Sequence, residues 1–309
     1  MKIGIIGAGA MGCLFACLLS GTQDVTLYDV SRETVDAINT RGVRCRSAGG
    51  EERRCSVPAA LSGSAGESAD LVILFVKDTV SRSALAGNTG LIGPDTLLLS
   101  LQNGMGNLEI MEDFAPRQRL LLGTTKHNCV SEGPGCIFHS GAGDTHIGSP
   151  DGSTARARTV SAVFSAAGIR TLLCPDVNHL LWEKLFLNAA VNPVTALLDC
   201  RIGVIAEDPG ARAITRALIE EAVAVAEADG QRFDREQVFQ TVMTAARTLS
   251  AGRASMCQDI RQGRRTEIDF INGAVVHLGE KYGIPTPRHS LITALIHTRE
   301  ALAAEERSN

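Results

Sequence analysis

The first twelve residues place closely spaced glycines directly after a short apolar run. Residues 1–6 read Met-Lys-Ile-Gly-Ile-Ile, then come Gly7-Ala8-Gly9-Ala10-Met11-Gly12 and a second apolar run. A G-x-G-x-x-G between an expected strand and an expected helix is typical of a dinucleotide-binding turn. Gly7 permits the tight turn, Gly9 lets the backbone approach a pyrophosphate, and Gly12 lets helix and strand pack closely. The alternative is a glycine-rich turn without a ligand.

Two side chains at and just beyond the end of the second expected strand, residues 24–29, help to distinguish NAD from NADP. Asp29 ends that strand, where a carboxylate accepts hydrogen bonds from a ribose 2′-OH and repels a 2′-phosphate. Arg32, three residues on, offers a cation for a 2′-phosphate, although an ordinary solvated helix residue is the alternative. The local chemistry therefore favours NAD over NADP.

A polar stripe runs through an otherwise apolar segment around residue 180. Lys184, Asn188 and Asn192 are spaced by four and lie on one face of a helix expected over residues 176–191. Their neighbours are Leu, Phe, Ala and Val, among which polar groups are costly unless paired or used. Pro193 disfavours helical geometry at Asn192. The alternative is a solvated face of an amphipathic helix.

The third polar constellation spans residues 255–273. It is dense in Ser, Asp, Glu, Arg and Asn, and it is expected to lie between two helices. Thr266 and Asp269 also resemble a helix-capping box with a shortened acid. On the pattern alone, a functional role and a capping role both stay open.

The composition excludes several classes of protein. The chain has 309 residues, a net charge of −4 and a pI near 6.0, so no nucleic-acid or anionic-membrane surface is expected. No apolar run reaches the ~20 residues of a membrane span, and the N-terminus lacks the features of a signal peptide. The nine cysteines contain no C-x-x-C pair and indicate reduced thiols in the cytoplasm. No H-E-x-x-H pattern occurs, so no metal is predicted.

The order of elements predicts the fold class. Strand and helix signals alternate up to residue 173, and beyond Asp176 only helical periodicity remains. We therefore expect an α/β protein, with an N-terminal Rossmann-type dinucleotide-binding domain, residues 1–175, and an all-helical C-terminal substrate domain, residues 176–309. Ligands of such sheets bind beyond the carboxyl ends of the parallel strands. The glycine turn, Asp29, Lys77 and Asn103 all follow expected strands, so we expect them to lie around one ligand site.

Taken together, these constellations resemble the ketopantoate reductase family (2-dehydropantoate 2-reductase, ApbA/PanE). The resemblance covers nearly the whole chain, and its last block is the most specific. The matching pieces are Gly7–Gly12, Lys77, Leu101-Gln102-Asn103-Gly104, Trp182 with Lys184, Asn188 and Asn192, and the block from Ser255-Met256 to Thr266-Glu267-Ile268-Asp269.

The resemblance implies that a nicotinamide dinucleotide reduces the keto carbon of ketopantoate to give pantoate, on the pathway to coenzyme A. Lys184 matches the catalytic lysine that protonates the carbonyl oxygen, and Glu267 matches its acidic partner. His179 is a rival acid that matches no functional position. The other matches are Ser255, Asn188 and Asn192 for substrate, Lys77 for cofactor, and Asn103 for both.

Two positions depart from the family pattern. Val30 stands where members that use NADP usually carry an arginine, so the family implies NADP while this chain leans to NAD. Ile202 stands where some members place an asparagine near the substrate. A related NAD(P)-dependent reductase of another 2-keto acid is therefore the alternative, with a non-catalytic dinucleotide sensor more remote. A homodimer through the helical domain is left open.

Overall fold

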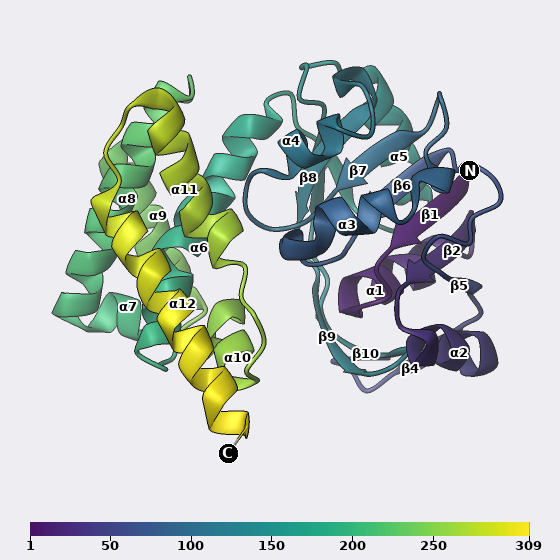
Figure 1. Ribbon diagram of the computed structural model, residues 1–309, viewed down its shortest axis with the longest axis horizontal. Helices are drawn as coiled ribbons and strands as arrows, with labels where there is room; N and C mark the ends of the chain where they lie inside the picture. The colour runs from purple at the N-terminus through teal and green to yellow at the C-terminus, as the bar shows by residue number, and fades with distance from the viewer. Residues whose placement is uncertain (309) are drawn as a thin grey trace. The chain divides into compact units, whose positions relative to one another are not determined.

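The computed structural model describes the backbone of residues 1–308 and the side chains of residues 1–305. It divides into two compact units (Figure 1). Unit 1 comprises Met1–Gln102 and Asn107–Leu180. Unit 2 comprises Asn103–Gly106 and the chain from Leu181 onward.

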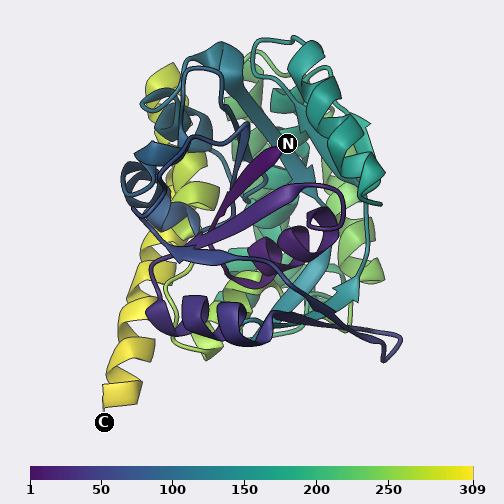
Figure 2. The ribbon, with the colours of Figure 1, turned by 90° about the vertical axis from the view of Figure 1, so that its right-hand side faces the viewer.

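Unit 1 is built on an eight-stranded sheet, of which β1 and β2 run side by side in Figure 2. All neighbouring strands are parallel except β8 and β11. The inner strands are buried along their length, as strands covered on both faces should be. In sheet order the strands are β12 (Thr171–Leu173), β11 (Thr145–Gly148), β8 (Leu120–Thr125), β7 (Leu97–Ser100), β6 (Leu71–Leu74), β1 (Lys2–Ile6), β2 (Asp24–Asp29) and β5 (Ala59–Leu61).

Helices connect these strands, as the alternating pattern predicts. Ser31 caps one of them, since its hydroxyl accepts a hydrogen bond from the Thr34 N–H at 3.2 Å. Phe15 and Phe164 bring two helices together on one face of the sheet, with ring centroids 5.7 Å apart. The helices are α1 (Ala10–Leu19), α2 (Arg32–Arg41), α3 (Ser81–Ala86), α4 (Asn107–Glu112) and α5 (Ala155–Ala166), with 3-10 turns η1 (Asp78–Val80), η2 (Thr89–Leu91) and η3 (Arg117–Arg119).

A second sheet corrects the sequence analysis. Its strands, in order, are β4 (Glu52–Cys55), β3 (Val43–Ser47), β10 (Cys136–Gly141) and β9 (Asn128–Gly133). The sequence of residues 42–66 is rich in Gly, Ser and charged residues and indicates at most one short strand, at residues 55–57, and the sequence shows no strand signal at residues 128–133. The reason is that this sheet buries little of each strand: β4 is exposed at three of its four residues. Its charged residues therefore conceal the alternation that marks a strand.

Unit 2 is helical, with a core around Trp182, Phe186 and Phe239. Asp208 and Asp234 cap two of its helices by accepting backbone N–H bonds. The helices are α6 (Val177–Leu197), α7 (Val204–Glu207), α8 (Pro209–Ala228), α9 (Arg235–Thr248), α10 (Ser255–Arg261), α11 (Ile268–Tyr282) and α12 (Pro287–Ser308). Across residues 1–308, no helix combines the length and apolar character needed to cross a membrane.

Helix α6 does not end before Pro193, contrary to the expected limit at residue 191. It continues to Leu197 with the proline inside it. Pro193 has no N–H for the carbonyl oxygen of Ala189, and Asn272 of α11 supplies the missing donor, its Nδ2 lying 2.9 Å from that oxygen. This replacement comes from a distant helix, so the local pattern could not reveal it.

Candidate active site

The glycine turn has the geometry that its sequence predicts. Gly7 has φ +102°, and a Cβ there would lie 2.8 Å from the carbonyl oxygen of Phe75. A Cβ on Gly12 would lie 1.8 Å from the carbonyl oxygen of Gly7, so neither position tolerates a side chain. A Cβ on Gly9 would meet nothing within 4 Å. The open space at Gly9, beside the first turn of α1, fits a pyrophosphate group bound by backbone N–H donors.

Asp29 supports this turn directly. Its Oδ2 accepts a hydrogen bond from the Ala8 N–H at 2.7 Å, and its Oδ1 accepts one from the Ser31 N–H at 2.9 Å. Each carboxylate oxygen keeps a second lone pair, so a ribose hydroxyl can still be accepted. Arg32 is exposed at the start of α2, and Val30 is 83% exposed. The sequence analysis assigned Asp29 to the ribose and missed its bond to the turn.

Lys77 lies half-buried beyond the end of β6, where it precedes η1. Gln102 fixes the backbone beside it, because its Nε2 donates to the carbonyl oxygen of Val76 at 2.7 Å and to Ser81 Oγ at 2.8 Å. The Gln102 Oε1 accepts a bond from Ser100 Oγ at 2.8 Å. Sequence reasoning did not assign this role to Gln102. The signal was a polar residue directly after a buried strand.

In unit 2, α6 carries the polar stripe. Lys184 and Asn188 are half-buried, and Asn192 is only 7% exposed. A solvated helix face is therefore not the explanation at Asn192. The indole of Trp182 is anchored on the same helix by a 2.8 Å hydrogen bond from its Nε1 to Asp229 Oδ2. This bond limits rotation of α6 about its own axis, and therefore fixes the direction in which the polar stripe faces.

Asn103 and Glu267 are both placed by the first turn of α11. Asn103 belongs to the short segment of unit 2 in which the Met105 N–H donates to the carbonyl oxygen of Phe270 at 2.9 Å. The Phe270 N–H in turn donates to the carbonyl oxygen of Glu267 at 3.1 Å. A Cβ on Gly104 would lie 2.3 Å from the Phe270 oxygen, so this close approach requires glycine.

The capping-box interpretation of Thr266 and Asp269 is wrong in its pairing. The Thr266 hydroxyl accepts from the Ile268 N–H at 3.2 Å, but the Thr266 N–H donates to Glu300 Oε1 at 2.7 Å rather than to Asp269. Asp269 lies instead 2.8 Å from Nε2 of His297. Burial alone would lower the pKa of His297, but its hydrogen bonds and ion pairs with Glu300 and Asp269 outweigh this and raise it.

The other candidate residues are Ser255, Ile202 and His179, and they lie at different places in the structure. Ser255 is the exposed first residue of α10. Ile202 lies beside the loop that leads to it, because the Ile202 N–H donates to the carbonyl oxygen of Gly252 at 2.9 Å. His179 and Lys184 are five residues apart, which places them about 140° apart around α6. They therefore cannot serve the same face of the helix. Within the described side chains, no cluster of His, Cys, Asp or Glu is arranged to hold a metal.

A mostly parallel sheet with this glycine turn, together with a helix presenting a lysine and two asparagines, is the combination typical of a dinucleotide-dependent oxidoreductase. Family models of the ketopantoate reductase PanE/ApbA match residues 3–152, and models of its C-terminal region match residues 176–300. The chain therefore belongs to the ketopantoate reductase PanE/ApbA family.

Several known proteins are similar to this chain over almost its full length. A 2-dehydropantoate 2-reductase of Streptococcus pyogenes is 35% identical, covering 98% of this chain and 99% of the relative. One from Halobacterium salinarum is 34% identical over 93% and 95%, respectively. A structure of D-mandelate dehydrogenase with NADH and anilino(oxo)acetate has a TM-score of 0.92 at 30% identity, covering 98% of this chain and 100% of that one. A PanE/ApbA family ketopantoate reductase from Ralstonia eutropha gives 0.90 at 31%, with the same coverage.

Proposed function

We propose that this protein is a 2-dehydropantoate 2-reductase, which reduces ketopantoate to pantoate with a nicotinamide dinucleotide. The observation that carries the proposal is the match to curated reductases over 98% of the chain, with Lys184, Asn188 and Asn192 intact on one face of α6. The bound dinucleotide supplies the hydride that reaches the keto carbon. A cytoplasmic location stays a prediction from the sequence.

In this proposal Lys184 is the general acid. Its ammonium donates a proton to the carbonyl oxygen as negative charge develops there, a role for which a positioned cation is well suited. Glu267, at the start of α11, orients the lysine. Asn188 and Asn192 hold the substrate, and the Ser255 hydroxyl binds its carboxylate. Each of these roles follows from the family resemblance.

The dinucleotide-binding part is assigned to residues 1–175 and the catalytic part to residues 176–309. Gly7–Gly12 hold the pyrophosphate, and Lys77 lies beside the cofactor. Asn103 is assigned to both cofactor and substrate, and it is the exception to this division because its segment packs with the helical unit.

Between NAD and NADP, we propose that the cofactor is NAD. Asp29 keeps acceptor capacity for a 2′-OH, and its negative charge opposes a 2′-phosphate. The exposed Val30 supplies no cation, which leaves Arg32 as the nearby candidate for a phosphate. The similar D-mandelate dehydrogenase structure contains NADH, which is consistent with this choice.

The test is a comparison of kcat/KM for ketopantoate and for matched 2-keto acids, each with NADH and NADPH. One matched compound is 3,3-dimethyl-2-oxobutyrate, which lacks only the hydroxyl of ketopantoate. We expect ketopantoate to be the best substrate and NADH the better donor. A higher kcat/KM for the compound without the hydroxyl would contradict the assignment and make Ile202 the first position to change.

A further inference from the structure

The only non-glycine residue with positive φ among residues 1–308 is Asp199, at +48°. It lies two residues beyond the end of α6, and the Cys200 N–H donates to the carbonyl oxygen of Thr195 at 3.1 Å. This bond belongs to a helix terminus at which glycine is the usual residue in the left-handed position. An aspartate there is strained, and strain held in place by its surroundings points to a role for the side chain.

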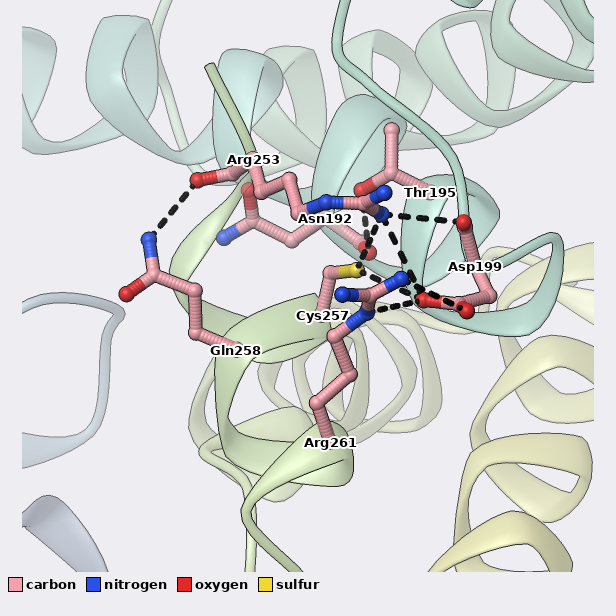
Figure 3. Close-up of polar contacts among 7 residues, drawn as sticks. All are labelled: Asn192, Thr195, Asp199, Arg253, Cys257, Gln258 and Arg261. Carbon is pink, nitrogen blue, oxygen red and sulfur yellow. Dashed lines mark hydrogen bonds and ion pairs between the residues drawn. The ribbon is translucent and has the colours of Figure 1, made fainter.

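The Asp199 carboxylate is the centre of a polar cluster (Figure 3). Arg261 donates to it through two nitrogens, from Nε to Oδ1 at 2.6 Å and from Nη2 to Oδ2 at 3.0 Å. The Nη1 of Arg253 lies 2.9 Å from the Asp199 carbonyl oxygen and 3.4 Å from Oδ1. The Cys257 thiol lies 3.6 Å from Oδ1. The guanidinium of Arg261 holds the pKa of Asp199 below its ordinary value.

The cluster joins two elements that the proposed function uses. Asp199 follows the end of α6, the helix of Asn188 and Asn192, whereas its three partners lie on α10 or just before it. Ser255 falls between the partners Arg253 and Cys257. Two backbone bonds run alongside, from the Ile202 N–H to the Gly252 carbonyl oxygen at 2.9 Å and from the Gly203 N–H to the Ser250 carbonyl oxygen at 3.1 Å.

We propose that Asp199 is a positioning residue for substrate binding. Its carboxylate holds α10 against the end of α6, through Arg253 just before that helix and Arg261 at its last residue. It thereby fixes Ser255 relative to Asn192. The proposal rests on the proposed function of Ser255 and Asn192. Asp199 touches no reacting atom in this account. Its effect should therefore appear in the KM for the keto acid and not in the chemical step.

Asp199→Gly separates this role from a merely structural one. Glycine adopts the left-handed conformation without strain, so the backbone is relieved while the carboxylate is lost. We expect the KM for ketopantoate to rise about fivefold or more, with kcat and the KM for the dinucleotide within about twofold of wild type. We also expect Tm to lie within about 2 °C of wild type or above it, because exposed ion pairs add little stability.

Variants of Arg261 complete the test. Arg261→Met should raise the keto-acid KM as Asp199→Gly does, and the double variant should add nothing further, because both changes remove the same contact. Arg261→Lys should raise the keto-acid KM less than Arg261→Met does. A lysine keeps the positive charge but cannot donate to both carboxylate oxygens in the two-pronged geometry. The matched control is Glu236→Gln, which breaks the 2.8 Å pair between Arg216 and Glu236 in the same unit and should leave every constant unchanged.

A second readout is independent of turnover. Cys257 is buried beside Asp199. Burial raises the pKa of its thiol, Arg253 opposes this rise, and the Asp199 carboxylate adds to it. Alkylation of Cys257, followed by mass spectrometry, should be faster in Arg261→Met than in wild type. This variant keeps the Asp199 carboxylate, so a faster rate reports greater exposure of the thiol and not the loss of a negative charge beside it. If wild type fails to reduce ketopantoate, the proposed function fails, and the alkylation rate still decides whether Asp199 holds α10. Unchanged alkylation and unchanged keto-acid KM would overturn the proposal, as would a Tm that falls together with every kinetic constant.

Discussion

Asn272 donates a hydrogen bond to the carbonyl oxygen of Ala189 at 2.9 Å, in the place of the N–H that Pro193 lacks. The same Nδ2 lies 3.1 Å from Nδ1 of His289. One buried amide of α11 thus completes the backbone of α6 between Lys184 and Asn192. The carbonyl oxygen of Ala189 in α6 is therefore paired by a residue 83 positions away in sequence.

Replacing Asn272 should therefore destabilise the protein in a way that depends on Pro193. Asn272→Ala leaves the Ala189 oxygen unpaired and should lower the free energy of unfolding by about 1–3 kcal/mol. Pro193→Ala restores an N–H, so in that background the loss should be smaller. Denaturant unfolding of the four proteins in this double-mutant cycle measures the difference. An equal loss with and without the proline would contradict the account.

Asp29 should matter for both dinucleotides. Asp29→Ala removes the acceptor for the Ala8 N–H, so the glycine turn loses its support whichever cofactor is bound. A hydrogen bond to a charged group contributes about 1.5–3 kcal/mol, and we expect weaker binding of both NADH and NADPH. The loss should be larger for NADH, which also loses the acceptor for its 2′-OH, whereas NADPH is relieved of a negative charge near its 2′-phosphate. Titration of each cofactor by fluorescence measures the two Kd values. A loss confined to NADH would instead assign Asp29 to the ribose alone.

Two histidines should give opposite pH dependences of stability. Burial lowers the pKa of His289 below its ordinary 6.5 and outweighs the opposing effects of Leu218 and Glu221. Below pH 6.5, His289 binds a proton in the unfolded chain but not in the folded chain. The free energy of unfolding therefore falls as the pH drops. The raised pKa of His297 has the reverse effect, and its contribution is complete below pH 6.5 and lost as the pH rises through the raised pKa.

Unfolding free energies measured from pH 5 to 8 test this assignment. His289→Gln should flatten the wild-type curve below about pH 6.5, whereas His297→Gln should flatten it above. Each variant serves as the control for the other. Curves that change in the same pH range for both variants would mean that the two histidines are assigned to the wrong environments.

The parts of the fold that the sequence predicted depend on local signals. The glycine turn, the strand at residues 24–29 and the alternation of strands and helices are each specified by residues close together in sequence, and all appear in the structure. Strands β3, β4 and β9 were missed or misplaced because their exposed, charged residues conceal the alternation.

The candidate site shows the same limit at longer range. The spacing of Lys184, Asn188 and Asn192 predicted their common face, since helical periodicity is a local property. The contacts that fix α6 come from residues remote in sequence: Asn272 donates to the Ala189 carbonyl oxygen, and Arg261 pairs with Asp199 just beyond the end of the helix. No local pattern identifies such pairs, because each consists of residues joined only by the tertiary fold.

The role of Lys184 as general acid is tested most directly by the steady-state reduction of ketopantoate by wild type and by Lys184→Gln, with dinucleotide Kd measured in parallel. We predict that wild type forms one pantoate for each dinucleotide oxidised. We also predict that the variant binds the dinucleotide normally but loses about 10²–10⁴-fold in kcat, which is the usual contribution of a general acid. No pantoate from wild type, or full turnover without Lys184, would contradict it.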